Sequence, residues 1–323
     1  MKEIIIGENE KDQRLDRFLK KYLKNAPLSH IFKIIRKDVK VNGKRKKIDD
    51  MLKKGDVITL YISDYEIEQL TYVRDRVRVK KQFKIVYEDD NIIVVDKPLG
   101  LLIHGDKNEK KNHLTNQVID YLIEKGAYEP RTEKTFVPAP VNRLDRNTTG
   151  LVLFAKNAMA VKKLNEMMRN RDNIEKYYLT IVKGNIDKEM FLSSKMTKDE
   201  EKNMITVHNQ NYKEGKLMET VVRPIKKLRG YTLVEVNIIT GRTHQIRAHL
   251  SSIGHPVIGD VKYGERSVNF KFRKDFELNT QLLHSYKLVF KKCLEGLKYL
   301  EGKELSAEIP DTFQQIMDDI DGR

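Results

Sequence analysis

The chain has 323 residues and a formal net charge of +15, from 62 lysines and arginines against 47 aspartates and glutamates. This length fits two domains, and the basic balance favours a polyanion such as nucleic acid as the partner. The single cysteine excludes an internal disulfide and a cysteine-based metal centre, and no apolar run approaches the ~18 residues needed to span a bilayer, so we expect a cytoplasmic protein with no membrane contact.

The N-terminal residues predict a compact module with two helices. Apolar side chains between residues 15 and 23 recur at the spacing of an amphipathic helix. A second helix is predicted over residues 31–35, and Ser29 is placed to cap its N-terminus. Two helices this close together favour a small, separately packed unit.

A short sheet completes the predicted module. Residues 39–41 and 57–62 are rich in valine and isoleucine, which favours strands. Asn42 and Gly43 form a hairpin-type turn after the first of them. Cations suited to phosphate contacts decorate the module, among them Lys33, Arg36 and Lys44.

This module resembles the small RNA-binding domain named after ribosomal small-subunit protein four. The resemblance rests on the segments RLD at residues 14–16, IIR at 34–36, VKVNGK at 39–44 and KGD at 54–56. The sequence departs from that pattern where Lys37 and Asp38 stand in place of a glycine. The resemblance implies that the module binds RNA.

A charged stretch divides the module from a larger unit. We assign residues 1–64 to the module, 65–82 to a linker and 83–323 to the larger unit, and the alternation near the end of the linker also allows a short edge strand. In the larger unit, strands and irregularly placed helices alternate without a regular βαβ repeat. They predict an α+β fold, in which the small module precedes a large, mixed and mainly antiparallel sheet flanked by helices. Strands are expected at 91–96, 151–155, 177–182, 219–222 and 231–239, and helices near 114–122, 159–168 and 243–253.

The most informative segment is NRLDRNTTGL at residues 142–151. Asp145 lies between Arg143 and Arg146, directly before a polar turn and an apolar strand. Two neighbouring guanidinium groups keep such an acid ionised and bring it close to a nucleic-acid backbone. The alternative is a turn that carries ordinary surface ion pairs.

The larger unit resembles the RluA family of RNA pseudouridine synthases from about residue 83 to residue 290. The segment around Asp145 carries this resemblance, although the family often has histidine where this chain has Asn142. Further matching segments stand in the family's order: IVVDKP at 93–98, KYYLTIV at 176–182, GRTHQIRAHL at 241–250, GHP at 254–256 with GD at 259–260 and YG at 263–264, and LLHS at 282–285.

The resemblance implies an isomerase that needs neither a redox cofactor nor ATP, so we expect no cofactor. It implies that Asp145 is the catalytic aspartate, with Tyr178 against the target base and Arg247 as the charge partner of Asp145. Tyr177 is excluded because strand alternation sends it to the opposite face. Arg143 resembles the residue that helps to displace the base. Whether Asp145 attacks the sugar, assists its deprotonation or adds to the base stays open.

Spacing separates the remaining arginines and histidines of the 243–253 helix. Arg242 and Arg247 would be about 140° apart around a helix, so only one of them can reach Asp145, and Arg242 is expected to meet phosphate or to cap the turn. Arg146 is a further RNA-contact candidate. His244, His249 and His255 lack the i, i+4 spacing of a helical zinc site, so we expect no metal.

We therefore expect a monomeric enzyme that isomerises specific uridines in structured RNA, with 23S ribosomal RNA preferred as the substrate. A transfer-RNA pseudouridine synthase and a non-catalytic RNA-binding factor of ribosome assembly are the alternatives. A glycosidase is disfavoured because no motif supplies the second carboxylate that it needs about 5–10 Å away.

Overall fold

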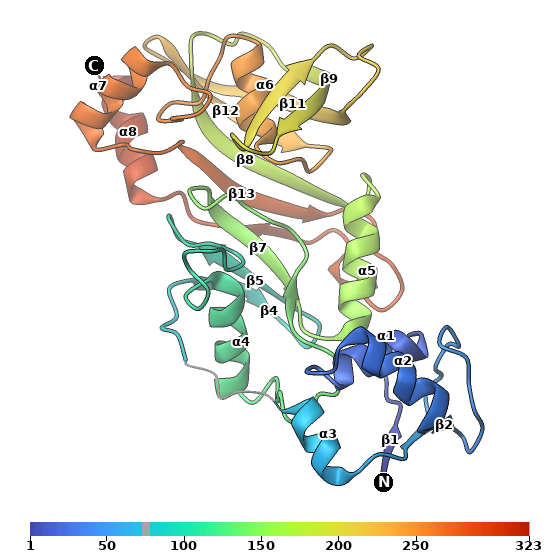
Figure 1. The fold of residues 1–323 in the computed structure, drawn as a ribbon. Coiled ribbons are helices and arrows are strands. Elements are labelled where there is room, and N and C mark those ends of the chain that lie inside the picture. The colour runs from blue at the N-terminus through green and yellow to red at the C-terminus, as the bar shows by residue number, and fades with distance from the viewer. Residues whose placement is uncertain (73–77, 323) are drawn as a thin grey trace.

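The computed structural model describes residues 1–72 and 78–322 and contains one small and one large β-sheet (Figure 1). The small sheet has 3 strands and belongs to the N-terminal module, whereas the large sheet has 11. Eight α-helices of the described residues pack around them. This arrangement confirms the predicted α+β class and the mainly antiparallel pairing of the large sheet.

The N-terminal module packs two helices on the small sheet. Leu15, Phe18 and Leu19 are fully buried, which confirms the predicted apolar stripe of the first helix. The predicted cap by Ser29 is wrong, because the second helix begins two residues earlier than such a cap requires, at Leu28 after Pro27, and Ser29 lies within its first turn. The elements are β1 (Lys2–Ile5), α1 (Leu15–Tyr22), α2 (Leu28–Lys37), β2 (Val39–Val41) and β3 (Val57–Leu60), with β3 central in the sheet.

A third helix occupies the start of the predicted linker. Helix α3 (Asp64–Thr71) is capped by the Ser63 side chain, which accepts a hydrogen bond from the backbone N–H of Glu66. Its Ile67 is buried in the core of the module. The regular structure of the module therefore continues past residue 64. The edge strand was allowed in the stretch 74–81: residues 73–77 lie outside the described residues, and residues 78–81 form no strand.

The large sheet is formed of two antiparallel groups joined by a strand from near the end of the chain. The strand order is β10-β9-β11-β12-β8-β13-β7-β5-β4, with β14 on β13 and β6 on β7. Strand β13 pairs antiparallel with β8 but parallel with β7, where only two residue pairs meet. The strands are β4 (Lys84–Glu88), β5 (Ile92–Lys97), β6 (Ala139–Pro140), β7 (Thr149–Ala155), β8 (Ile174–Lys183), β9 (Met190–Asp199), β10 (Met204–His208), β11 (Lys216–Leu228), β12 (Tyr231–Ile238), β13 (Leu283–Phe290) and β14 (Glu304–Ser306).

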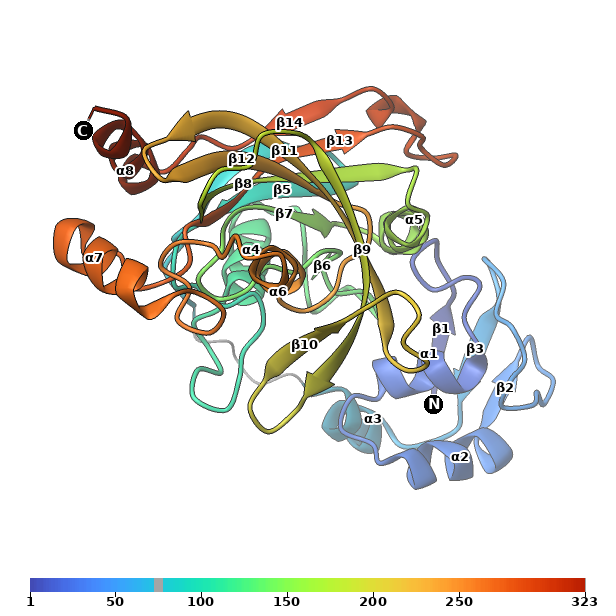
Figure 2. The same cartoon turned by 90° about the horizontal axis from the view of Figure 1, so that it is seen from above.

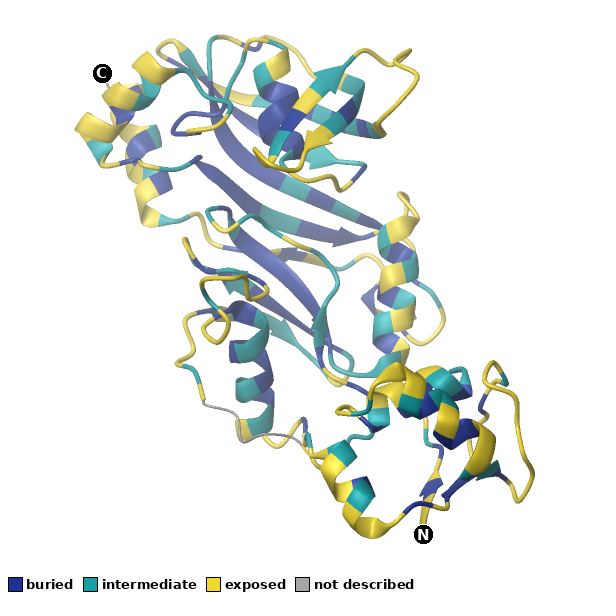
Figure 3. Cartoon of the chain, in the orientation of Figure 1, coloured by how far each residue is buried: buried dark blue, intermediate teal, exposed yellow. Residues whose placement is uncertain are grey.

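Helices cover both faces of this sheet, whose central strands are buried (Figures 2 and 3). Alternate residues of β5 and β7 pack against α4 on one face and α5 on the other. Residues of β8 and β12 likewise divide between α6 and the pair α7 and α8. The helices are α4 (Leu114–Glu124), α5 (Ala158–Arg169), α6 (Gln245–Ser252), α7 (Arg266–Phe276) and α8 (Asp311–Gly322), and Lys298–Leu300 is a 3-10 turn.

Polar contacts join the module to the larger unit next to α5. Asn9 donates to both carboxylate oxygens of Glu133 and accepts from the backbone N–H of Ala158, at the first residue of α5. Gln13 donates to the Thr135 hydroxyl at 3.4 Å. The loop before α1 therefore contacts the larger unit directly. None of the described helices has the length and apolar character needed to cross a bilayer.

Candidate active site

A cavity of about 560 Å³ lies where the two strand groups of the large sheet meet. The loop before β7 supplies Asp145 to it, β8 supplies Tyr178, and α6 with its preceding loop supplies Arg247. Within the described part of the chain, six arginine or lysine side chains line the cavity against one carboxylate, that of Asp145. A cavity with this charge balance suits a polyanionic ligand.

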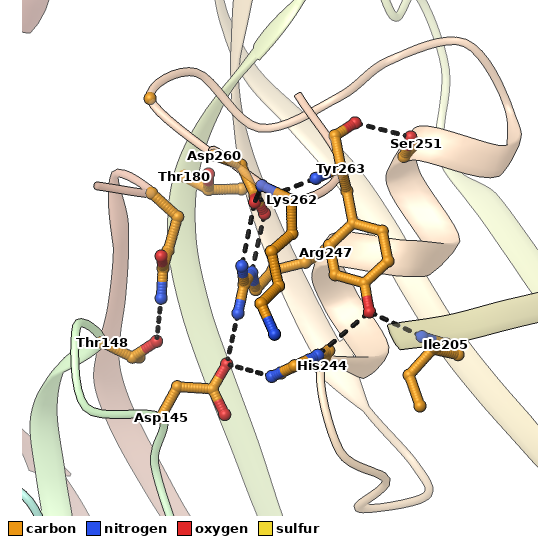
Figure 4. Close-up of polar contacts among 12 residues, drawn as sticks. Asp145, Thr148, Thr180, Ile205, His244, Arg247, Ser251, Asp260, Lys262 and Tyr263 are labelled. Carbon is orange, nitrogen blue, oxygen red and sulfur yellow. Dashed lines mark hydrogen bonds and ion pairs between the residues drawn. The ribbon is translucent and has the colours of Figure 1, made fainter. Parts of the chain in front are cut away.

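Arg247 connects two carboxylates that differ in burial (Figure 4). Its Nη1 donates to Oδ2 of Asp145 at 2.9 Å, while Nε and Nη2 donate to the two oxygens of Asp260 at 2.6 and 2.9 Å. The Asp260 side chain is fully buried, whereas that of Asp145 is 29% exposed. One edge of the guanidinium is therefore fixed in the interior, and Nη1 meets an acid that solvent or substrate can reach.

Asp260 is stabilised in its ionised form. Its Oδ1 also accepts hydrogen bonds from the backbone N–H groups of Lys262 and Tyr263. Burial raises the pKa of Asp260, but its bonds to Arg247 and to these two amides outweigh burial and lower that pKa. The paired carboxylate and guanidinium thus stay charged in the interior.

His244 faces the same carboxylate oxygen of Asp145 that Arg247 contacts (Figure 4). The Tyr263 hydroxyl accepts from the backbone N–H of Ile205 and lies 3.0 Å from Nδ1 of His244, to which it can donate. Nε2 of His244 is then the protonated nitrogen, 3.9 Å from Oδ2 of Asp145. Burial lowers the pKa of His244, so the imidazole is neutral at pH 7. Arg247 is therefore the charged partner of the aspartate.

A buried lysine supports the loop that carries Asp145. Nζ of Lys97 donates to three carbonyl oxygens, those of Pro98, Leu101 and Arg146, each at 3.0 Å. Burial lowers the pKa of Lys97 to about 7. The bond to the Arg146 carbonyl ties the end of β5 to the residue that follows Asp145.

The strand after this loop requires a glycine at its second residue. Gly150 has φ of +107°, and a Cβ atom there would lie 2.1 Å from the Ser285 carbonyl oxygen. This close approach is where β7 meets β13 in parallel. Asn142 secures the same segment, because its amide donates to the Leu151 carbonyl and accepts from the Leu153 N–H. The Asn142 side chain, at the position where the resembled family often has histidine, thus holds the backbone of this strand.

The start of α6 differs from the expected helix. The helix begins at Gln245, and His244 before it has a left-handed φ of +52°. Arg242 is therefore not helical, and the predicted angle between the two arginines does not apply. Arg242 is exposed and donates from Nε to the Leu217 carbonyl. The conclusion that Arg247 alone reaches Asp145 holds for this different reason.

Tyr178 faces the cavity and Tyr177 does not. Tyr178 is 5% exposed and lines the cavity with Asp145, whereas the Tyr177 hydroxyl donates to Glu175 on the other face of β8. Burial raises the pKa of Tyr178, so its phenol is protonated at neutral pH. The structure thus brings Asp145, Tyr178 and Arg247 together.

The predicted RNA-contact residues are divided between two regions. Arg143 and Arg242 line the cavity and are exposed, whereas Arg146 lies outside its lining and donates to the Gly100 carbonyl. The cations of the N-terminal module are exposed and lie outside the cavity lining; they are Lys33, Arg36 and Lys44.

Sequence reasoning gave no role to Asp260, Lys97, Tyr263 or Lys176. Each stands in a segment quoted for the family resemblance, so membership in a motif was the available signal. The histidines considered as metal ligands form ordinary hydrogen bonds instead: His249 contacts Thr220, and His255 contacts the Lys183 carbonyl. Among the described residues, no three His, Cys, Asp or Glu side chains are grouped to hold a metal ion.

Comparison with known proteins gives consistent matches. A family model described as RNA pseudouridylate synthase matches residues 91–252. The chain is 33% identical over 296 residues to ribosomal large subunit pseudouridine synthase C of Vibrio cholerae, covering 89% of this chain and 88% of that protein. It is 32% identical over 298 residues to the Escherichia coli K12 protein of the same name, covering 90% and 88%.

A solved structure shares the fold. Human RNA pseudouridylate synthase domain containing 4 superimposes with a TM-score of 0.56 at 21% identity, covering 71% of this chain and 90% of that one.

Proposed function

Because this chain belongs to the RNA pseudouridine synthase family, we propose that it converts specific uridines of 23S ribosomal RNA to pseudouridine. The names of its Vibrio cholerae and Escherichia coli relatives support the ribosomal substrate. The net charge of +15 and the cation-lined cavity are consistent with a large folded RNA.

The reaction is an isomerisation in which nothing is lost or gained overall. The bond between N1 of the base and C1′ of the ribose breaks, the base turns, and C5 bonds to C1′. The proton on C5 leaves and N1 takes one up. A site for this reaction needs an acid or nucleophile at the sugar or base, a group that holds the turning base, and cover from competing water.

One observation carries the proposal: the partly exposed Asp145 is paired with a guanidinium that Asp260 holds in place. We assign the catalytic role to Asp145, and attack on the sugar, assistance of its deprotonation and addition to the base are all open to it. Arg247 orients the carboxylate and balances its charge. The positions of both are fixed before substrate arrives, which avoids reorganisation during the reaction.

Tyr178 is assigned to the target base. Its ring lines the same cavity as Asp145, and its protonated phenol can stack against a pyrimidine and position a proton. A uridine stacked in an RNA helix cannot reach this cavity, so the nucleotide must flip out at a cost of a few kcal/mol. Arg143, exposed at the cavity beside Asp145, is assigned to displacing the base.

The N-terminal module is assigned to RNA binding, as its resemblance to the ribosomal-protein-four domain implies. The exposed cations Lys33, Arg36 and Lys44 support phosphate contact. Such contacts offset the cost of flipping a nucleotide at the distant cavity.

Pseudouridine mapping of total RNA tests the function. Cells with the wild-type protein should show marks in 23S ribosomal RNA that are absent without it. Asp145→Asn should abolish these marks, with at least about a thousandfold loss of rate, while thermal unfolding stays near the wild type. Asp311→Asn, at the start of α8, is the matched control and should keep every mark. Marks confined to transfer RNA would overturn the ribosomal assignment, and unchanged marks with Asp145→Asn would overturn the catalytic one.

A further inference from the structure

Lys176 is an unpaired cation in the interior of the molecule. The residue is 9% exposed and lies on β8, two positions before Tyr178. Among the described residues, no hydrogen-bond acceptor or carboxylate partners its ammonium group, and burial alone lowers its pKa. An ammonium that has lost most of its hydration without gaining a partner is costly, because neither hydrogen bonds nor an opposite charge replace the lost water.

The environment of Lys176 is open on one side, and that side is the active-site cavity. Lys176 lines this cavity together with Met168, Arg169 and Arg171 from the end of α5 and the segment after it. Arg171 is already neutralised by an ion pair with Glu219. Arg169 is exposed and donates from Nε to the Asn165 carbonyl. Within the described residues, Lys176 is therefore the buried cation in this part of the cavity that has no partner.

Strand geometry connects Lys176 to the catalytic residues. Residues two apart on a strand point to the same face and are about 6.6 Å apart along it, so Lys176 and Tyr178 face the same cavity. Lys176 thus lies within one nucleotide's reach of Tyr178 but not beside it.

We propose that Lys176 binds a phosphodiester of the RNA next to the flipped nucleotide. This inference rests on the proposed function for the nature of the ligand. The arriving phosphate supplies the missing counter-charge and hydrogen-bond acceptors, so the cost of the unpaired ammonium in the free protein is recovered only when RNA is bound. A neutral nucleoside lacks the phosphate and therefore gains no binding energy from this lysine.

The test compares Lys176→Met, Lys176→Arg and the control Lys271→Met, which makes the same change on the exposed surface of α7. Binding of a 20-nucleotide oligouridylate is measured across a range of salt concentrations, a readout that needs no turnover. Lys176→Met should bind about tenfold more weakly, and its slope of log affinity against log salt should be smaller by about 0.7. Lys176→Arg should keep most of the wild-type affinity and of the wild-type salt slope. Lys271→Met should match the wild type in both quantities.

Steady-state kinetics on ribosomal RNA give the second readout. Lys176→Met should raise KM by about tenfold and leave kcat within about twofold, because the lysine holds RNA away from the reacting atoms. Methionine fills the same space without a charge, so thermal unfolding should not fall; if that variant does not fold, Lys176→Gln carries the same measurements.

Two results separate this inference from the proposed function. Wild-type affinity and salt slope in Lys176→Met would overturn the phosphate site even if pseudouridine is formed. A weaker, less salt-dependent binding by Lys176→Met would uphold the site even if the wild-type protein formed no pseudouridine.

Discussion

Arg247 is a single side chain that joins a fully buried acid, Asp260, to an accessible one, Asp145. Three of its N–H groups are used, two on Asp260 and one on Asp145. Because Asp260 accepts two further amides, its position is determined by backbone as well as by charge. Asp260 is therefore a positioning residue that acts through Arg247.

Replacing Asp260 with asparagine should impair both activity and stability. The change leaves a buried guanidinium short of one charge, and breaking a buried pair costs about 3–5 kcal/mol. We expect kcat to fall at least about tenfold with KM little changed, and the free energy of unfolding measured in urea to fall. Glu265→Gln, which removes the partly exposed pair with Lys183, is the control and should alter stability by less than about 1 kcal/mol. Full activity of Asp260→Asn would show that Arg247 does not depend on it.

The sequence motifs indicated the candidate catalytic residues but not the groups that hold them in position. Asp145, Tyr178 and Arg247 were predicted from their motifs, and the structure brings them to one cavity. Asp260 and Lys97 stand in motifs too, but their function depends on partners 13 and 49 positions away in the chain. Such distances are set by tertiary folding and leave no trace in local spacing.

Among the elements, α6 is tied to the sheet by a buried histidine. His249 of α6 is 1% exposed and lies 2.9 Å from the Thr220 hydroxyl of β11. Burial lowers the pKa of His249 to about 4, and that of His284 on β13 likewise to about 4. Both imidazoles are therefore neutral in the folded protein throughout the range in which the unfolded chain takes up protons.

This difference predicts acid sensitivity between pH 6.5 and 4. The unfolded chain binds these protons near its ordinary histidine pKa of 6.5 and the folded protein only near 4, so stability is present above pH 6.5 and is lost as the pH falls. Each histidine accounts for about 3 kcal/mol by pH 4. Between pH 6.5 and 4, the free energy of unfolding measured in urea should fall by about 3 kcal/mol less for His249→Gln than for the wild type. An equal fall of unfolding free energy with pH in the two proteins would show that His249 does not cause this acid sensitivity.

Strong apolar periodicity was sufficient to predict α1, α4, α5 and the central strands. The hairpin β9–β10 and helix α7 were missed, because β9 is mostly half-exposed and α7 buries only Phe272. Helix α3 was assigned to a linker for the same reason, since only Ile67 is buried. Elements that bury one or two side chains show little periodicity.

Across the whole molecule, the N-terminal module lies beside the N-terminal end of α5 (Figure 1), and none of its described residues lines the cavity that contains Asp145. Its role can be separated from catalysis by deleting residues 1–72. We expect KM for ribosomal RNA to rise at least about tenfold and kcat to stay within about twofold, because the phosphate contacts of the module are lost while the cavity is intact. The control is a full-length variant with Lys33, Arg36 and Lys44 changed to glutamine, which should give a smaller rise in KM. An unchanged KM after the deletion would contradict an RNA-binding role.

The sequence could indicate two units but not how the two strand groups of the larger sheet are joined. The apolar strands were visible, whereas the insertion of β13 between β7 and β8 was not, because it pairs residues more than 100 positions apart. Only two residue pairs make the parallel contact, too few to leave a pattern.

The late position of β13 has a consequence for synthesis. The ribosome synthesises Asp145, Tyr178 and Arg247 before it reaches Leu283–Phe290. At that stage Asp145 belongs to one group of strands, and Tyr178 and Arg247 belong to the other. In the described residues, β13 is the strand that bridges those groups. Nascent chains and products of premature termination therefore lack an assembled catalytic centre, and RNA modification is reserved for polypeptides whose translation has passed that strand.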